Sequence, residues 1–372
     1  MEDFMSEMSE EELDLACRAL ARTIARSQRV VVLTGAGISV SAGIPDFRSK
    51  GGMWTRYDPK VYANYNNFLA HPEMFWKMST ELRVATSNKQ PTKAHFALER
   101  LQRMGKLSSL ITQNVDNLHQ LSGVENVIEL HGTGKICHCI QCDYKGNIDV
   151  VLPQHIVPWI DIPRCPVCGA LIKLDVVLFG EPLQSDNFQR AFTAASSADV
   201  FLVIGSSLEV MPANQLPRRA KMSSSTVAFI NKSSTRYDDF TDYTLRGDSD
   251  VLVPKLVDYV AKYMDSLCMD NFIDIVTFPL KVISSPFDAL TQFVTFVAKW
   301  ATPVKVEEDI PKQLVDSSEV VEQALTNPIT HQVEKKRSKS EERKAEDKVM
   351  EEINQSLRLR STEIPKESQL FN

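Results

Sequence analysis

Five short apolar runs, each ending in glycine or polar residues, constrain the fold of this chain more than any other feature. They are residues 30–33, 107–111, 127–130, 200–204 and 226–230. Several are almost wholly apolar, and helix-like stretches separate them. This pattern is typical of parallel strands that are buried on both faces. We therefore predict an α/β fold with a doubly wound, mostly parallel sheet.

The polar residues that follow these runs indicate where a ligand binds. In an open parallel sheet, ligands bind outside the carboxyl ends of the strands. The five predicted strand ends therefore meet at one crevice, where we place the active site. Before the first strand, residues 11–26 carry apolar side chains at helical spacing, which predicts one amphipathic helix.

Composition excludes several classes of protein. The net charge of −6 gives no sign of nucleic acid as the main ligand. The acidic start, MEDFMSEMSEEELDL, resembles neither a secretory signal nor a mitochondrial transit peptide. Seven unevenly placed cysteines argue against a disulfide scaffold. We expect a cytoplasmic or nuclear protein.

Two CxxC pairs predict a structural zinc site. Cys139 and Cys142 form the first pair, Cys165 and Cys168 the second, with 22 residues between the pairs. Each pair can give two thiolates to one tetrahedral ion, and four protein ligands leave no open position for chemistry. Cys137 lies just outside this set and is interpreted as a buried small residue or an alternative ligand. The neighbouring His138 is expected to be exposed.

The segment TGAGISVSAGIPDFRS at 34–49 predicts a nucleotide-phosphate site. A glycine turn directly after a strand can present backbone N–H groups to a pyrophosphate. Gly35 and Gly37 fit the dinucleotide pattern, whereas Val40 stands at its third glycine position. A plain strand-to-helix turn is the alternative that the residues alone leave open.

Together with four further motifs, this segment resembles the sirtuin family. The motifs are TQNVDNLH at 112–119, HG at 131–132, FGE at 179–181 and GSSLEV at 205–210. The resemblance covers residues 12–262 and implies a Rossmann-like catalytic domain with a zinc module at about 135–172. It also implies a cleft that binds NAD from one side and acylated lysine peptides from the other. The implied reaction gives free lysine, nicotinamide and O-acyl-ADP-ribose.

The resemblance implies roles for individual residues. His131 would be the catalytic base, with Asn114 assisting, and His119 would support the ribose. Without the family context, a lone histidine is more often structural, and an Asn–Asp pair more often forms a turn or a helix N-cap. The implied cofactor-binding residues are Gly35, Ala36, Gly37, Ile38, Asp46, Phe47, Arg48, Gln113, Asn114, Asp116, Gly205, Ser206, Asn231, Lys232 and Asp248.

Two extended segments are expected to bind the substrate. Val177 and Phe179 lie on one, and Glu209 and Val210 on the other, so that a peptide strand could add between them. Desuccinylating sirtuins carry Tyr and Arg for an acidic acyl group, where an ungapped alignment places Ser79 and Leu82 here. This favours acetyl or a longer apolar acyl group.

The resemblance does not cover the C-terminal part. Residues 268–303 predict an apolar, amphipathic helical extension, and the charge-dense residues 304–372 predict a disordered tail. The face formed by 287–300 suits packing on the domain or on another chain, or a weak contact with a membrane.

Three other functions are alternatives to the deacylase. A mono-ADP-ribosyltransferase would cleave NAD with the same residues. A non-enzymatic, NAD-responsive binding module would be expected to lack His131 or Asn114, and both are present. A zinc-ribbon nucleic-acid binder would need a basic, aromatic stripe around the cysteines. The sequence therefore favours the deacylase and no specific nucleic-acid partner.

Overall fold

The computed structural model describes residues 8–152 and 160–277. The helices of this part are α1 Glu10–Arg26, α2 Pro59–Tyr62, α3 Tyr65–Ala70, α4 Pro72–Thr86, α5 Lys93–Arg103, α6 Leu118–Leu121, α7 Ile148–Val151, α8 Ser185–Ser197, α9 Leu216–Met222 and α10 Ser249–Thr277. The strands are β1 Val30–Thr34, β2 Leu107–Thr112, β3 Ile128–Glu129, β4 Gly132–Cys139, β5 Lys145–Asn147, β6 Ile172–Val176, β7 Val200–Ile204, β8 Thr226–Asn231 and β9 Tyr243–Arg246. None of the described helices is long and apolar enough to cross a membrane.

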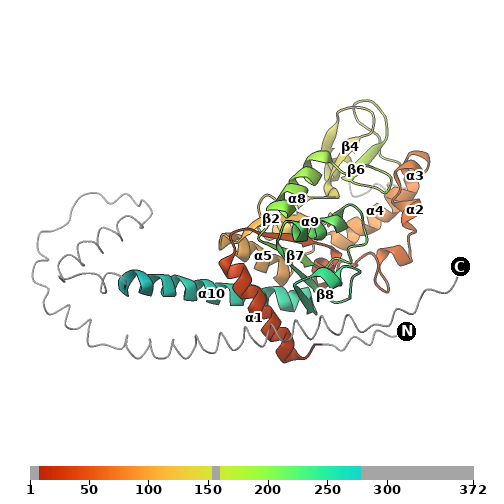
Figure 1. Cartoon of the computed structure of the whole chain (residues 1–372). Coiled ribbons are helices and arrows are strands. Elements are labelled where there is room, and N and C mark those ends of the chain that lie inside the picture. Colours follow the sequence, from red (N-terminus) through yellow and green to blue (C-terminus); the bar gives the residue numbers. More distant parts are fainter. Residues whose placement is uncertain (1–7, 153–159, 278–372) are drawn as a thin grey trace, which may run out of the picture. The chain divides into compact units, whose positions relative to one another are not determined.

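Six strands of this part form a parallel sheet in the order β3-β2-β1-β7-β8-β9 (Figure 1). If these six are numbered along the chain, the order is 3-2-1-4-5-6, which is that of dinucleotide-binding folds. The strand order reverses between β1 and β7. A ligand crevice is therefore expected at the carboxyl ends of these two strands.

The structure confirms all five predicted strands and the predicted first helix. The run 127–130 forms only the two-residue strand β3, and β9 was not predicted. Helix α1 begins at a capping box, in which Ser9 and Glu12 each accept the other's backbone N–H. These two bonds satisfy backbone N–H groups that the start of a helix leaves without a partner.

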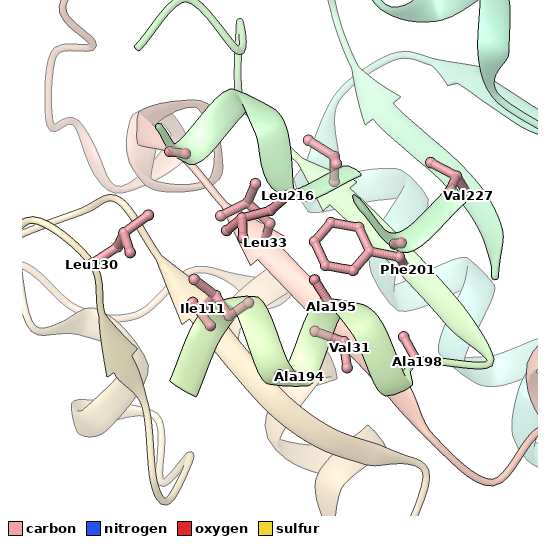
Figure 2. Packing of buried hydrophobic residues seen from close by; sticks show 14 of the residues in the cluster. Val31, Leu33, Ile111, Leu130, Ala194, Ala195, Ala198, Phe201, Leu216 and Val227 are labelled. Atoms are coloured by element: carbon pink, nitrogen blue, oxygen red, sulfur yellow. The ribbon is translucent and has the colours of Figure 1, made fainter. Parts of the chain in front are cut away.

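Helices cover both faces of the sheet. On one face, Ala194 and Ala195 of α8, with Ala198 just after the helix, pack over Val31 and Phe201 (Figure 2). The small alanine side chains let the helix approach the strands closely. Alternate strand residues point to the opposite face, and Val30 and Val32 there are also fully buried. The near-continuous apolar runs are explained by this double burial.

A smaller unit is inserted between β3 and β7. It contains the antiparallel sheet β5-β4-β6, and its core is continuous with that of helices α3 and α4. Met78 and Phe75 of α4 and Ile148 and Leu174 of the inserted unit belong to this shared core. The inserted unit and α4 therefore form one wall beside the larger sheet's crevice.

The domain limits inferred from the sequence stay predictions. The described residues up to Tyr263 form one compact unit, which holds the residues of the candidate site. Helix α10 runs from Ser249 to Thr277 and so enters the predicted extension without a break. The apolar face at 287–300 and the tail at 304–372 lie outside the described residues.

Candidate active site

A large cavity lies at the carboxyl ends of β1, β2, β7 and β8, with a volume of about 1230 Å³. Eighteen of the residues expected to bind cofactor or substrate, or to act in catalysis, line it: Gly35, Ala36, Gly37, Asp46, Phe47, Arg48, Gln113, Asn114, Asp116, His131, Val177, Phe179, Gly205, Ser206, Glu209, Val210, Asn231 and Lys232. Ile38 and Asp248 do not line it. Ile38 is fully buried, so its side chain is not placed to contact the cofactor as the resemblance implied.

The glycine turn packs against the loop that follows β7. A Cβ atom on Gly35 would lie 2.7 Å from the carbonyl oxygen of Gly205, and one on Gly37 would lie 2.7 Å from its Cα. The Gly35 and Gly37 N–H groups donate to the carbonyls of Ile204 and Gly205. These two N–H groups are therefore not free for a pyrophosphate, and the glycines serve first to bring the two loops together.

Asn114 and Asp116 are joined through Ser39, a residue that the sequence analysis missed. The Ser39 hydroxyl donates to the Asp116 carboxylate at 2.6 Å and accepts from the Asn114 amide at 3.2 Å. Asn114 also donates to the carbonyl of Gly35 at 3.1 Å. These bonds fix both side chains against the glycine turn. The Ser in GAGIS was the signal, since a buried hydroxyl needs a partner.

The imidazole of His131 has one nitrogen occupied and one free. Nδ1 lies 3.2 Å from the carbonyl oxygen of Gln113, which can only accept, so Nδ1 carries the proton of the neutral ring. Nε2 is then the basic nitrogen, and it is buried with no hydrogen-bond partner among the described residues. Burial is the largest influence on the pKa of His131 and lowers it below 6.5. The bond to Gln113 raises this pKa, and the charge of Arg48 lowers it.

His119, the second histidine of this region, has a structural role. It is fully buried, and its Nε2 bonds to Thr34, whose hydroxyl donates to Thr112. Its ring lies 4.5 Å from that of His95, measured between centroids. Burial lowers the pKa of His119 well below its usual value. His119 therefore supports the ends of β1 and β2 and does not line the cavity.

The loop after the glycine turn is held in a defined conformation. The Asp46 carboxylate accepts from the backbone N–H groups of Arg48 and Ser49 at 3.0 and 2.8 Å. Asp46, implied as a cofactor-binding residue, therefore orients this loop through its carboxylate. The Phe47 ring packs on Trp54 with their centroids 5.0 Å apart, and Trp54 lies 6.4 Å from Phe179. One row of aromatic rings thus connects this loop with the expected substrate segment.

Beside the glycine turn, Asn231 holds the loop after β7. Its amide accepts from the Ser206 N–H and donates to the Ser206 carbonyl, both at 2.9 Å. Lys232 pairs with Asp248 at 2.8 Å. Asn231 therefore shapes this part of the cavity through Ser206, and Asp248 acts on it through Lys232.

The expected substrate segment lines the cavity through Val177 and Phe179, and Phe179 is 42% exposed. Both main-chain groups of Phe179 are bonded to the helical part: its N–H donates to Ala63, and its carbonyl accepts from Tyr65. Val177 donates its N–H to the carbonyl of His131 at 2.9 Å, which ties the segment to the histidine.

The four predicted zinc ligands come together in the inserted unit. The sulfur atoms of Cys139, Cys142, Cys165 and Cys168 all lie within 4.8 Å of one another. Backbone N–H groups of Gln141 and Cys142 point at the Cys139 sulfur, and that of Val167 at the Cys165 sulfur. The two CxxC turns together fit one tetrahedral zinc ion, whose role would be structural.

The structure also shows the surroundings of Cys137 and His138, the two residues before Cys139. Cys137 is fully buried and its thiol donates to the carbonyl of Gly146, so it is the small buried residue and not a ligand. His138 was expected to be exposed, which is wrong. Its side chain is only 30% exposed and lies 3.3 Å from Asp175.

Comparison with known proteins identifies the family. The sequence profile of the Sir2 family matches residues 35–212. An NAD-dependent protein deacetylase of Pyrobaculum aerophilum is 45% identical over 239 residues, which cover 64% of this chain and 92% of that protein. The chain belongs to the Sir2 family. An NAD-dependent protein deacylase of Archaeoglobus fulgidus is 41% identical, covering 65% of this chain and 97% of that protein.

Solved Sir2 structures share the fold of this sirtuin. A complex of a Sir2 homologue with NAD is 39% identical, with a TM-score of 0.62, over 66% of this chain and 94% of its own. A Sir2 variant with a deacetylated peptide and 3'-O-acetyl-ADP-ribose is 32% identical, with a TM-score of 0.61, over 65% of this chain and 97% of its own.

Proposed function

We propose that this sirtuin removes acyl groups from protein lysines at the expense of NAD, with Nε2 of His131 as the general base. One observation carries the proposal: the unpartnered Nε2 lies on a ring that lines the same cavity as the glycine turn and Asn114. The relatives' activities and the NAD complex of a homologue support the choice of reaction.

The first step needs nicotinamide held in place while its bond to the ribose breaks. Asp116 can accept hydrogen bonds from a carboxamide, and Asn114 can orient a ribose hydroxyl or a water. Both side chains are fixed through Ser39, so they are already positioned before NAD binds. The acyl carbonyl oxygen of the substrate then attacks the anomeric carbon, and nicotinamide leaves.

The second step needs a base. A ribose hydroxyl attacks the former carbonyl carbon of the acyl group, which is now joined to the anomeric carbon through oxygen, and the hydroxyl proton passes to Nε2 of His131. The lowered pKa keeps His131 neutral at pH 7, and the Gln113 carbonyl holds it in the tautomer whose free nitrogen faces the substrate. Water then completes the release of lysine and O-acyl-ADP-ribose.

Phe47, Arg48 and the four cysteines shield the reacting carbon, bind the pyrophosphate and stabilise the inserted unit. Phe47, held by Trp54, covers the reacting carbon against water, which limits loss of the intermediate by hydrolysis. Arg48 is suited to the pyrophosphate, because its charge is partly buried in the cavity wall. The zinc ion ties the inserted unit together and takes no part in the reaction.

The proposal is tested by incubating the protein with NAD and an acetyl-lysine peptide. Mass spectrometry should show nicotinamide, free lysine and O-acetyl-ADP-ribose in equal amounts. NAD cleavage that does not depend on the acyl group, with ADP-ribose on the peptide, would instead establish the mono-ADP-ribosyltransferase. A cytoplasmic or nuclear location and the absence of a specific nucleic-acid partner stay predictions.

A further inference from the structure

Two buried histidines lie in contact beside the glycine turn. His95 at the start of α5 and His119 in α6 are 0% and 1% exposed, and their ring centroids lie 4.5 Å apart. Neither of them lines the cavity. Nε2 of His95 and Nδ1 of His119 have no hydrogen-bond partner among the described residues. Buried polar atoms without a partner are rare, so the surroundings of the two rings call for an explanation.

His119 is connected to Asn114 through two threonines. Its Nε2 lies 2.9 Å from the hydroxyl oxygen of Thr34, and the Thr34 hydroxyl donates to that of Thr112 at 2.8 Å. The Thr112 hydroxyl oxygen also accepts the backbone N–H of Asn114 at 3.1 Å. Because Thr34 gives its proton to Thr112, Nε2 of His119 is the donor to Thr34. Consecutive hydrogen bonds thus connect this ring with the main chain of Asn114.

His95 is connected to the glycine turn in a similar way. Its Nδ1 accepts the backbone N–H of Thr92 at 3.3 Å, as the third residue of a capping box at the start of α5. The Thr92 hydroxyl lies 2.8 Å from the same nitrogen and donates to the carbonyl of Ile38 at 3.2 Å. Ile38 directly precedes Ser39, so His95 supports the main chain beside the hydroxyl that fixes Asn114.

The tautomers of the two rings match each other. Nδ1 of His95 is an acceptor, so its Nε2 carries the proton of the neutral ring. Nε2 of His119 is a donor, so its Nδ1 has a free lone pair. A donor on one ring and an acceptor on the other are therefore left in the same buried contact. Burial lowers the pKa of both histidines, to about 4 for His95, which keeps the rings in these neutral forms.

We propose that His95 and His119 are positioning residues, which together set the distance between Ser39 and Asn114 and so control the departure of nicotinamide. The inference rests on the proposed function and deepens it. Ser39 follows β1 and Asn114 follows β2, so their 3.2 Å bond depends on how the two strand ends are held. The histidines lie outside the cavity wall and act on the reaction only through these strand ends. A misplacement of about 1 Å can slow a positioned reaction about a hundredfold.

Two variants of one histidine test the proposal. His119→Leu removes the donor to Thr34, whereas His119→Gln keeps an amide donor at the place of Nε2. We expect His119→Leu to lower kcat for acyl-dependent nicotinamide exchange into NAD by at least about tenfold, with the KM for NAD changed less than about threefold. The KM is kept because Arg48 and Lys232, which line the cavity and are expected to bind other parts of NAD, are untouched. His119→Gln should keep most of the rate, and a His119→Leu enzyme as fast as His119→Gln would overturn the proposal.

Threonine variants keep the proposal testable where His119→Leu does not fold. Thr34→Val and Thr92→Val each remove one hydroxyl of the network with little change of volume, and each should slow nicotinamide exchange. Leu20→Ala is the control for general destabilisation, because Leu20 is fully buried in α1 and its truncation leaves a cavity in the core. Circular dichroism verifies that each variant is folded. An equal loss of exchange in Leu20→Ala and Thr34→Val would assign the effect to stability and overturn the proposal.

Crystal structures of the variants separate this proposal from the deacylase function. In His119→Leu, Ser39 and Asn114 should have moved apart beyond hydrogen-bond distance, whereas His119→Gln should keep their bond. Unchanged positions of Ser39 and Asn114 in His119→Leu would overturn the proposal, whatever the activity of the protein. Absence of acyl-dependent exchange in the unchanged protein would refute the deacylase instead, and displaced side chains in His119→Leu would still establish the positioning role.

Discussion

Replacing Lys173 by methionine is expected to cost this fold on the order of 3 kcal/mol of unfolding free energy. The Lys173 side chain is 1% exposed. Its ammonium donates to the carbonyls of Leu174 and Val176 at 3.0 and 2.6 Å and pairs with Glu181 at 3.2 Å. Glu181 in turn accepts the Leu178 N–H at 3.0 Å. The pair thus closes the substrate segment on itself.

The magnitude follows from what the substitution leaves behind. Methionine fills the volume but leaves a carboxylate and two carbonyls without their donor. Breaking a buried ion pair by removing one partner costs about 3–5 kcal/mol. We expect the lower end, because the Glu181 side chain is 20% exposed and water can reach it. Burial lowers the pKa of Lys173, so desolvation already offsets part of the pair's attraction.

Urea unfolding at fixed zinc, followed by fluorescence and circular dichroism, measures the loss. The double variant Lys173→Met with Glu181→Leu removes both charges and should recover more than half of it. Lys145→Met is the control: this lysine is 60% exposed, pairs with Asp175 and should contribute less than about 1 kcal/mol. A Lys173→Met loss equal to that of Lys145→Met, or a double variant no more stable than the single one, would refute the reasoning.

Three further predictions concern titration and metal. Because burial lowers the pKa of His131, the base stays neutral at more acidic pH, and the acid limb of kcat/KM should have its midpoint below 6.5; a midpoint above 6.5 would contradict this. Burial lowers the pKa of His95 to about 4. As the pH falls from 6.5 to 4, this imidazole therefore takes up a proton in the unfolded chain before it does so in the folded protein. This favours the unfolded state, and up to about 3 kcal/mol of the free energy of unfolding is lost over this range. Between pH 7.5 and 5, the free energy of unfolding of His95→Gln, measured by urea titration, should fall by correspondingly less than that of the unchanged protein. Equal losses in the two proteins would show that His95 does not cause the pH dependence. Chelation of zinc, or Cys142→Ala, should lower the melting temperature and loosen the inserted unit in hydrogen exchange; unchanged exchange at β4 and β6 would show that the four thiols need no metal.

The sequence was most informative where one physical demand determined the residues. Strands buried on both faces must be apolar along their whole length, so β1 and β7 were found with nearly correct ends. Four thiols at CxxC spacing have few uses other than zinc. The strand β9, with the sequence YTLR, lies at the sheet edge with only one buried residue. It therefore carries no comparable pattern.

The site was predicted in outline and corrected in detail. The strand-end position and the family resemblance indicated His131, but which of its nitrogens is basic depends on a carbonyl that only the fold brings near. The Gly35 and Gly37 amides were expected to face a phosphate, yet they bond to the end of β7 and to the loop after it, which the linear sequence does not place beside them. Ser39 escaped notice for the same reason, since its partners are 75 and 77 residues away.

Exchange of labelled nicotinamide into NAD, measured beside product formation, tests the central role of His131 most directly. The nicotinamide leaves before the base is needed, so the two steps respond differently to His131→Ala. With an acyl-lysine peptide present, the account predicts that the variant keeps acyl-dependent exchange and loses O-acyl-ADP-ribose formation by at least a hundredfold. Formation of O-acyl-ADP-ribose by His131→Ala at the rate of the unchanged protein would contradict it.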